Sequence, residues 1–218
     1  MKPRRRVGIL ISGRGSNMMA LVQAARAPDY PAEIVCVVSN RPAAAGLAWA
    51  REQGIAAHAV DHKAYATREA FEDALQAVLE GEGVELVACA GFMRLMTPSF
   101  VARWAGRMIN IHPSLLPLYP GLDTHARALA DGVRIAGCTV HFVTADMDAG
   151  PIIVQGAVPV VDDDTPDSLA ERILKIEHEI YPRALAFVAS GAARLEGGRV
   201  RILTDVNQAA RLISPDEG

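Results

Sequence analysis

The sequence predicts an α/β fold with a mostly parallel, twisted sheet, helices on both faces, and antiparallel strands and a long helix in the C-terminal part. Three observations predict it. Short apolar runs alternate with stretches of helical periodicity through the first half of the chain. These runs lack the polar alternation of half-exposed strands, as expected for strands covered on both faces. In the second half, two candidate strands follow one another with only a loop between them.

The first half alternates strand and helix patterns in order. Apolar and β-branched runs predict strands at 7–11, 34–38, 86–90 and 108–111, with a shorter candidate at 56–60. Between them, apolar residues recur at helical spacing and predict helices at 18–26, 44–53, 69–79 and 100–104. Gly54 stands just past the second helix, where glycine commonly ends a helix.

The second half follows a different pattern. A short helix is expected at 126–130, and strands at 138–143 and 152–160 are joined by the acidic loop Asp146–Pro151. A long helix is expected at 168–188, and Gly197-Gly198 predicts the turn of a late hairpin. The sequence shows no linker and no internal repeat. We therefore expect one domain, residues 1–218, with a soft subdivision near residue 105 into a phosphate-binding half and a catalytic half.

Composition argues for a small-molecule enzyme or binding protein. Hydrophobic residues make up 50% of the 218 residues and charged residues 22%, which is ordinary for a globular chain. The net charge of -3 argues against a nucleic-acid or membrane surface as the main partner. No apolar run could span a bilayer and no leader pattern is present. The three cysteines lie far apart in apolar runs, which predicts reduced core residues in a cytoplasmic protein.

The stretch Ser12–Asn17 is the first candidate site, because it follows a strand and opens a helix, where backbone N–H groups favour an anion. A dinucleotide fingerprint fits poorly, since Met18 occupies the third glycine position and Asn40 stands where an acidic ribose-binding residue is expected. The lysine of a P-loop is also missing. Two interpretations stay open: a single phosphate held by Gly15, Ser16 and Asn17, or a tight turn whose serine or asparagine caps the helix.

Asn110 and His112 form the second candidate site. They stand two residues apart at the end of an apolar strand, so both side chains lie on one face. A carboxylate from the acidic loop, Asp146 or Asp148, would favour the charged imidazole. An amide and an imidazolium side by side would suit a developing oxyanion. The alternative is a pair of structural polar groups in a turn. No histidine pair has zinc-ligand spacing and no nucleophile elbow is present, so neither a metal nor an acyl-enzyme is expected.

Four segments together resemble the glycinamide ribonucleotide formyltransferases of purine biosynthesis: "ISGRGSN" at 11–17, "AGFMRLMTPSF" at 90–100, "NIHPSLLPLYPGLDTH" at 110–125 and "VHFVTADMDAGPII" at 140–153. The likeness extends to about residue 190. It implies the Rossmann-like formyltransferase fold and formyl transfer from 10-formyltetrahydrofolate to the amine of 5-phosphoribosylglycinamide. It also implies Asn110, His112 and Asp148 as the catalytic group.

The same resemblance implies the binding residues. Phosphate would be held at Gly15, Ser16 and Asn17, with further acceptor contacts from Glu177. Folate contacts would come from the 144–148 loop and from a set of separate residues: Arg68, Met93, Arg94, Leu95, Met96 and Asn110. The chain departs from the family at Ala149, where glycine is common, and at Leu118, where a basic residue is frequent. The family pattern further implies a cis peptide bond at Leu116-Pro117.

Two other functions remain as alternatives. A formyltetrahydrofolate deformylase shares this catalytic group but gives the formyl group to water, and that family typically carries an extra domain before the core. Here the first strand is expected at Val7, and the phosphate loop favours a phosphorylated acceptor. A non-catalytic nucleotide-binding module is the second alternative, disfavoured by the intact Asn110, His112 and Asp148. The sequence is compatible with a monomer or a homodimer.

Overall fold

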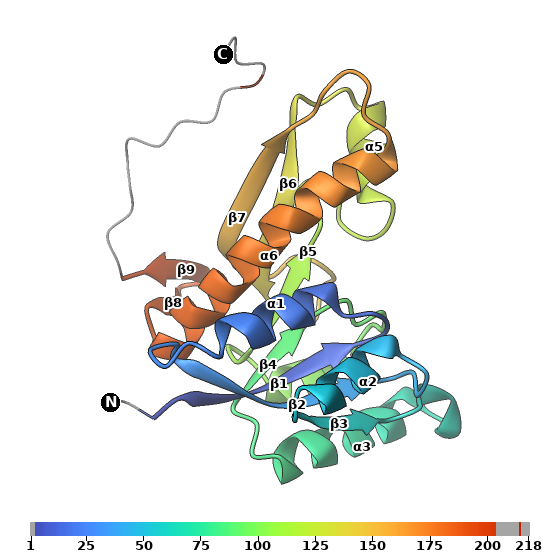
Figure 1. Ribbon diagram of the computed structural model, residues 1–218, viewed down its shortest axis with the longest axis vertical. Helices are drawn as coiled ribbons and strands as arrows, with labels where there is room; N and C mark the ends of the chain where they lie inside the picture. The colour runs from blue at the N-terminus through green and yellow to red at the C-terminus, as the bar shows by residue number, and fades with distance from the viewer. Residues whose placement is uncertain (1–2, 204–213, 215–218) are drawn as a thin grey trace.

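The computed structural model describes residues 3–203 and residue 214, and its centre is a seven-stranded sheet of order β3-β2-β1-β4-β5-β6-β7 (Figure 1). The strands are β1 Arg5–Ile11, β2 Ala32–Ser39, β3 Ala56–Ala59, β4 Leu86–Cys89, β5 Met108–His112, β6 Ile135–Phe142 and β7 Ile152–Pro159. The pairs from β3 to β5 are parallel, while β6 runs antiparallel to β5 and β7 antiparallel to β6. The predicted fold class is confirmed.

Helices cover both faces of the sheet, because successive strand residues point to opposite sides. In β1, Ile9 and Ile11 pack in one cluster with helices α1 (Ser16–Ala24), α2 (Ala45–Glu52) and α6 (Pro166–Ser190). Leu10 points the other way, into a second cluster with α3 (Arg68–Gly81) and α4 (Pro98–Arg103). Each strand therefore buries both faces, which explains why its sequence is apolar throughout.

The C-terminal part adds the elements that complete the site. Helix α5 (Thr124–Ala130) and the long α6 pack beside the β6–β7 pair in the upper part of Figure 1. Strands β8 (Ala193–Glu196) and β9 (Arg199–Ile202) form the hairpin predicted at Gly197-Gly198. The sheet is continuous across residue 105, because β4 pairs with β5. This continuity supports our proposal of a single domain with no more than a soft subdivision there.

Several element boundaries differ from the prediction by a few residues, and two of them are informative. β6 begins at Ile135, earlier than the expected 138, and passes through Gly137. A Cβ on Gly137 would lie 2.0 Å from the Gly156 carbonyl oxygen, so glycine here permits close strand contact rather than ending the strand. α4 begins at Pro98, because the Thr97 side chain accepts the Phe100 N–H. The short 3₁₀ helix η1, His62–Ala64, was not predicted.

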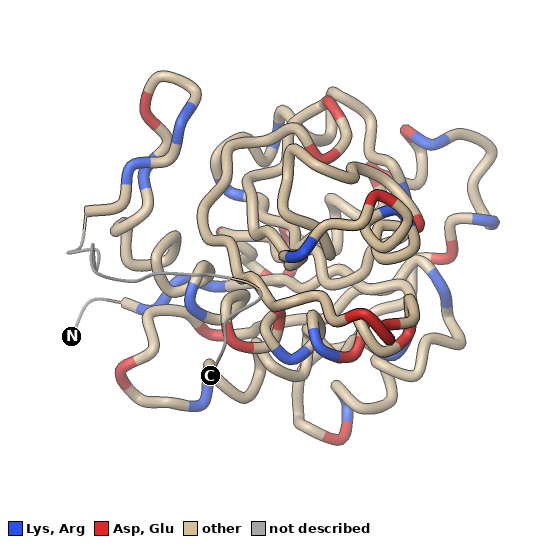
Figure 2. Tube along the Cα trace, turned by 90° about the horizontal axis from the view of Figure 1, so that it is seen from above, with Lys and Arg blue, Asp and Glu red and all other residues tan. Residues whose placement is uncertain are grey.

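The distribution of charged residues and the burial of the cysteines agree with the sequence analysis. Lysine and arginine alternate with aspartate and glutamate along the trace (Figure 2). The three cysteines, Cys36, Cys89 and Cys138, are free and buried, and burial is the main reason that the pKa of each thiol rises to about 12. They stay protonated at neutral pH and act as core residues. Within residues 3–203, no helix is long and apolar enough to cross a membrane.

Candidate active site

Asn110 and His112 lie where the sheet changes from parallel to antiparallel. Asn110 is level with Cys89, the last residue of β4, and His112 extends beyond it at the end of β5. On the other side, Asn110 pairs with His141 and His112 pairs with Thr139 of β6. Asn110 and His112 are two residues apart on β5, and His141 lies directly opposite Asn110 on β6. The three side chains therefore point to the same face of the sheet. In open α/β sheets, ligands commonly bind beyond the carboxyl ends of the strands, which is the end of β5 that carries Asn110 and His112.

Asp148 reaches this face from the β6–β7 loop. Its Oδ2 atom lies 3.4 Å from His112 Nδ1, and the two side chains are only 11% and 7% exposed. Asp148 adopts a left-handed backbone conformation with φ 53°, an uncommon state that aspartate tolerates better than most residues. Of the two carboxylates left open by the sequence, the structure brings Asp148 to the imidazole. Asp146 stays exposed in the same loop.

The other nitrogen of the His112 ring is already engaged. His112 Nε2 donates to the Tyr119 carbonyl oxygen at 2.9 Å, which requires a proton on Nε2 because a carbonyl only accepts. Nδ1 then faces a carboxylate, and a bare Nδ1 lone pair there would be repelled. In the imidazolium form of the ring, the Nδ1 proton lies beside Asp148 and donates to its carboxylate.

Asn110 is oriented by His141, a residue that the sequence analysis missed. His141 Nδ1 donates to the Phe142 carbonyl oxygen at 2.8 Å, and Asn110 Nδ2 lies 3.4 Å from His141 Nε2. Burial lowers the pKa of His141, outweighing the Phe142 carbonyl and Asp148, which raise it. A neutral ring with its proton on Nδ1 can accept from Asn110 through Nε2. The second amide N–H of Asn110 is then free for a ligand.

The phosphate-loop candidate opens α1 with Gly15 in the left-handed region, at φ 73°. No side chain caps this helix, so the capping interpretation of Ser16 and Asn17 does not hold. Instead, Asn17 Nδ2 donates to Glu177 Oε2 on α6 at 2.6 Å. Asn17 Oδ1 is buried without a partner. Asn17 thus joins Glu177 to the start of α1 at Gly15 and Ser16, where the N–H groups of the first helical turn favour an anion.

Glu177 is an ionisable group inside this cluster. It is 7% exposed, and burial raises the pKa of its carboxyl group, although the Asn17 hydrogen bond lowers it. A buried carboxylate with a single described partner retains lone pairs for ligand hydroxyl groups. His178, next to it, has a buried Nε2 atom without a partner.

The segment 91–97 borders the same site and connects to the phosphate loop. Met93 N donates to Ser12 Oγ at 2.8 Å, so the two loops are joined. Met93 and Leu95 are each 59% exposed, which leaves them free to contact a flat ligand ring. Arg94 lies over the Phe71 ring at 5.8 Å, and Arg68 is the exposed first residue of α3. Met96 packs against the second core cluster.

The family departures are accommodated without strain. Asp148 and Gly150 carry the special backbone requirements of their loop: Asp148 has positive φ, and a Cβ on Gly150 would lie 1.7 Å from the Phe142 carbonyl oxygen. Ala149 is exposed and is not among the residues with positive φ. Leu118 is 55% exposed. The Leu116-Pro117 bond is cis, as the resemblance implied.

Metal ligation has no support in the described ranges 3–203 and 214. There, no group of three or more histidine, cysteine, aspartate or glutamate side chains is placed to hold a metal ion. The polar groups gathered at the sheet edge are an amide, two imidazoles and a carboxylate, all in hydrogen-bond or ion-pair contact. Such a set is suited to binding an oxyanion and moving protons.

Comparison with known proteins agrees with this geometry. A family model described as "Formyl transferase" matches residues 5–185. The phosphoribosylglycinamide formyltransferase of Escherichia coli is 42% identical over 88% of this chain and 94% of its own length. The crystal structure of glycinamide ribonucleotide transformylase 1 from Symbiobacterium toebii has a TM-score of 0.90 and 47% identity, covering 94% of this chain and 96% of that one.

A longer relative shows the same unit inside a larger protein. The chain is 50% identical to the bovine (Bos taurus) trifunctional purine biosynthetic protein adenosine-3 over 92% of its residues, yet spans only 20% of that relative's length. The chain belongs to the formyl transferase family, and within it to the phosphoribosylglycinamide formyltransferases.

Proposed function

We propose that the chain transfers the formyl group of 10-formyltetrahydrofolate to the amine of 5-phosphoribosylglycinamide, as a cytoplasmic enzyme of purine biosynthesis. The observation that carries the proposal is the contact of His112 with Asp148 at 3.4 Å, beside Asn110. The Gly15–Asn17 cluster, joined to Glu177, supplies the second part of the site. Family membership supports both substrates. The free, buried cysteines fit a reducing compartment.

The acceptor amine can attack without a base. An α-amino group has a pKa of about 7.7–8.0, so a useful fraction is neutral near pH 7.5. The new bond joins the amine nitrogen to the formyl carbon, and the bond from that carbon to folate N10 breaks. One proton leaves the amine nitrogen and one is gained by N10. The enzyme must therefore stabilise the tetrahedral oxyanion and carry protons between the two nitrogens.

The catalytic group matches these requirements. The free N–H of Asn110 donates to the formyl oxygen, and the Nδ1 proton of His112 lies on the same face of the sheet. Asp148 accepts a hydrogen bond from that N–H group, His112 can pass a proton to folate N10 directly or through water, and the proton released by the amine restores the pair. The side chains are fixed before substrate binds, so little reorganisation is needed as charge develops.

The two substrates would occupy opposite sides of this group. The phosphate of the acceptor lies against Gly15, Ser16 and Asn17, and Glu177 accepts from ribose hydroxyl groups. Folate would lie against Arg68, the segment Met93–Met96 and the 144–148 loop. The exposed Met93 and Leu95 side chains supply apolar surface for the pterin ring, and Arg94 and Arg68 supply positive charge for its acidic tail.

Turnover of 10-formyltetrahydrofolate with and without 5-phosphoribosylglycinamide tests the proposal directly. Loss of the formyl group only when the acceptor is present, with formylated acceptor as product, is the expected result. Equal loss without acceptor would identify a deformylase. Ligand binding with no loss of the formyl group in either case would identify a non-catalytic nucleotide-binding module.

Gly15→Val is expected to raise KM for the phosphorylated acceptor while leaving folate affinity nearly unchanged. Gly15 has φ 73°, which a β-branched residue rarely adopts, and its Cβ would lie 3.1 Å from Met18 Cε. The first turn of α1 must then shift away from the phosphate. Steady-state kinetics with each substrate varied separately measures the effect.

Gly13→Ala is the matched control, because a Cβ at Gly13 meets nothing within 4 Å and its φ is not positive. Its KM values should equal those of the parent. Equal weakening of folate and acceptor binding in a folded Gly15→Val protein would mean that the loop serves a different ligand.

Glu177→Gln is expected to stabilise the free protein and to raise KM for the acceptor. Burial raises the pKa of Glu177, so the folded state favours the protonated carboxyl group. Ionisation then opposes folding, and stability falls as pH rises from the unfolded value of about 4.3 through the folded one. The glutamine carries no charge and can still accept from Asn17, which removes this penalty at pH 7.5.

Glu177→Gln should weaken binding of the acceptor, because a hydrogen bond to a charged group contributes about 1.5–3 kcal/mol. KM for the acceptor should therefore rise ~10- to 100-fold. Thermal unfolding at pH 7.5 and acceptor kinetics measure both effects. A lower unfolding temperature together with an unchanged KM would remove Glu177 from the acceptor site.

A further inference from the structure

The loop 113–123, which connects β5 to α5, holds both ionisable groups of the catalytic cluster through its backbone. The Tyr119 carbonyl oxygen accepts from His112 Nε2 at 2.9 Å. The Gly121 N–H donates to Asp148 Oδ2 at 2.8 Å. These two backbone groups fix the ring orientation of His112 and the carboxylate orientation of Asp148. The geometry of the cluster therefore depends on the conformation of this loop.

That conformation is not a relaxed one. Tyr119 and Asp123 both have positive φ, at 54° and 56°, and Gly121 has φ 81°. Non-glycine residues seldom adopt the left-handed region, because their Cβ atom crowds the following carbonyl oxygen. Such a backbone persists only where surrounding contacts over-determine it. The contacts that hold the loop are therefore part of what holds His112 and Asp148.

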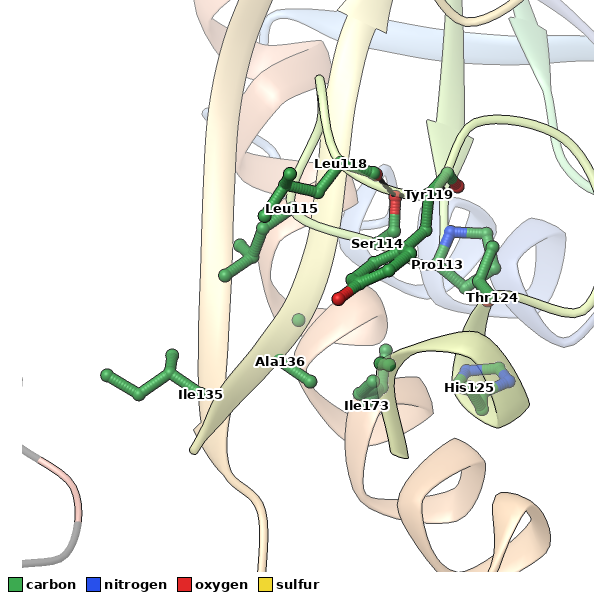
Figure 3. A pocket seen from close by; sticks show the side chains of 12 residues that line it. Pro113, Ser114, Leu115, Leu118, Tyr119, Thr124, His125, Ile135, Ala136 and Ile173 are labelled. Carbon is green, nitrogen blue, oxygen red and sulfur yellow. Dashed lines mark hydrogen bonds between the residues drawn. The ribbon is translucent and has the colours of Figure 1, made fainter. Parts of the chain in front are cut away.

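Arg127, in the last turn of α5, supplies three contacts to this loop from outside the site. Its Nη1 atom donates to the Pro120 carbonyl oxygen at 2.6 Å and to the Leu122 carbonyl oxygen at 3.4 Å. Its guanidinium group also lies over the Tyr119 ring, 5.4 Å from the ring centroid. Within the loop, Ser114 Oγ donates to the Leu118 carbonyl oxygen at 2.6 Å and also lies 3.2 Å from the Tyr119 carbonyl oxygen, and Figure 3 shows these residues at the same pocket.

We propose that Arg127 is a positioning residue for the formyl-transfer reaction, because it clamps Tyr119–Leu122 in the strained conformation that orients His112 and Asp148. This inference rests on the proposed function. Arg127 touches neither His112 nor Asp148 and acts through Tyr119 and Gly121. A planar guanidinium can stack on a ring and donate from its edge at the same time, which an ammonium group cannot do.

Arg127→Ala tests the clamp. We expect kcat to fall about five- to tenfold, less than the full effect of the lost cation–π contact and charge-assisted hydrogen bonds, because these exposed contacts act on the reaction only through the loop. KM for the acceptor should stay within about twofold, because the Gly15–Asn17 cluster lies elsewhere. The pH profile of kcat should also shift, since His112 loses its fixed acceptor. Arg127→Lys should recover only part of kcat, because lysine can donate without stacking.

Arg134→Ala is the matched control. Arg134 is likewise exposed and follows α5, but it pairs with Asp162. Its kcat and pH profile should match the parent. A ¹⁵N NMR measurement of the His112 ring needs no activity, so it tests the positioning role of Arg127 separately from the proposed function. Loss of the Nε2 hydrogen bond in Arg127→Ala supports the positioning role even if formyl transfer is absent.

Two results would overturn the clamp. One is an Arg127→Ala protein with parental kcat, pH profile and His112 ring signals. The other is a destabilised protein whose kcat falls while its pH profile and ring signals remain parental, which would make Arg127 a structural residue of α5 alone. Failure of the parent to transfer formyl groups would contradict the proposed function and not the clamp.

Discussion

Replacing His112 with alanine is expected to lower kcat by ~10²–10³, the scale for losing a group that stabilises charge or moves a proton at the reacting atoms. The His112 ring is buried, donates through Nε2 to the Tyr119 carbonyl oxygen, and places Nδ1 beside Asp148. Alanine removes both ring nitrogens and leaves Asp148 without this partner. Substrate binding depends mainly on other residues, so KM for both substrates should change much less than kcat. Single-turnover formyl transfer measures the chemical step.

His58→Ala provides the matched control, because it also removes an imidazole paired with a carboxylate: His58 Nε2 lies 2.7 Å from Glu82 Oε1. This pair links the edge strand β3 to the end of α3, away from the catalytic cluster. Its kcat should be parental. Cooperative thermal unfolding must be retained in both variants. An activity of His112→Ala within a few-fold of the parent would remove His112 from the mechanism.

Local sequence patterns predicted most of the strands and helices of the fold. Buried parallel strands need apolar residues on both faces, and the runs at 7–11, 34–38 and 86–90 reveal them directly. Gly15 and the polar residues after it marked the start of α1, because a strand followed by a glycine turn and a helix has few alternatives. Asn110 and His112 were visible because polar residues seldom end a buried strand.

The remaining site features arise from contacts between distant segments. His141 reads as one histidine in an apolar strand, and its role appears only when β6 pairs antiparallel with β5 and sets it against Asn110. The Tyr119 carbonyl oxygen carries no sequence signal at all, because any residue has one. Gly137 was interpreted as lying outside the strand, whereas its missing side chain admits the backbone of β7.

The contact that joins the phosphate loop to the segment 91–97 could not be predicted from the sequence either. Ser12 was singled out only as the start of a phosphate loop, but its hydroxyl donates to Asn40 Oδ1 at 2.5 Å and accepts from Met93 N at 2.8 Å. Residues 81 positions apart thus share one buried hydroxyl. Serine beside glycine in a turn is common, so composition could not separate this role from an ordinary turn.

Asp148→Asn is expected to lower kcat at pH 7.5 by replacing the charge that favours the doubly protonated His112 ring. A nearby opposite charge shifts a protonation equilibrium by about ten- to a thousandfold, so kcat should fall within that range. The asparagine keeps nearly the same shape, tolerates the positive φ of this position, and can still accept from Gly121 N. Its amide nitrogen then takes the Oδ1 position on the His141 side, so an uncharged oxygen faces His112 Nδ1 in place of a carboxylate.

The sign of the pH dependence distinguishes charge from position. Removing the carboxylate disfavours the doubly protonated ring, so kcat of Asp148→Asn, taken as a ratio to the parent at the same pH, should partly recover as pH is lowered. The ratio is needed because protonation of the acceptor amine, with a pKa of about 8, slows attack in both proteins. Asp146→Asn, an exposed change in the same loop, should behave as the parent. NMR titration of His112 in all three proteins completes the test. An unchanged ring protonation alongside a large loss of rate would make Asp148 a residue that orders the loop, and the charge argument would then be wrong.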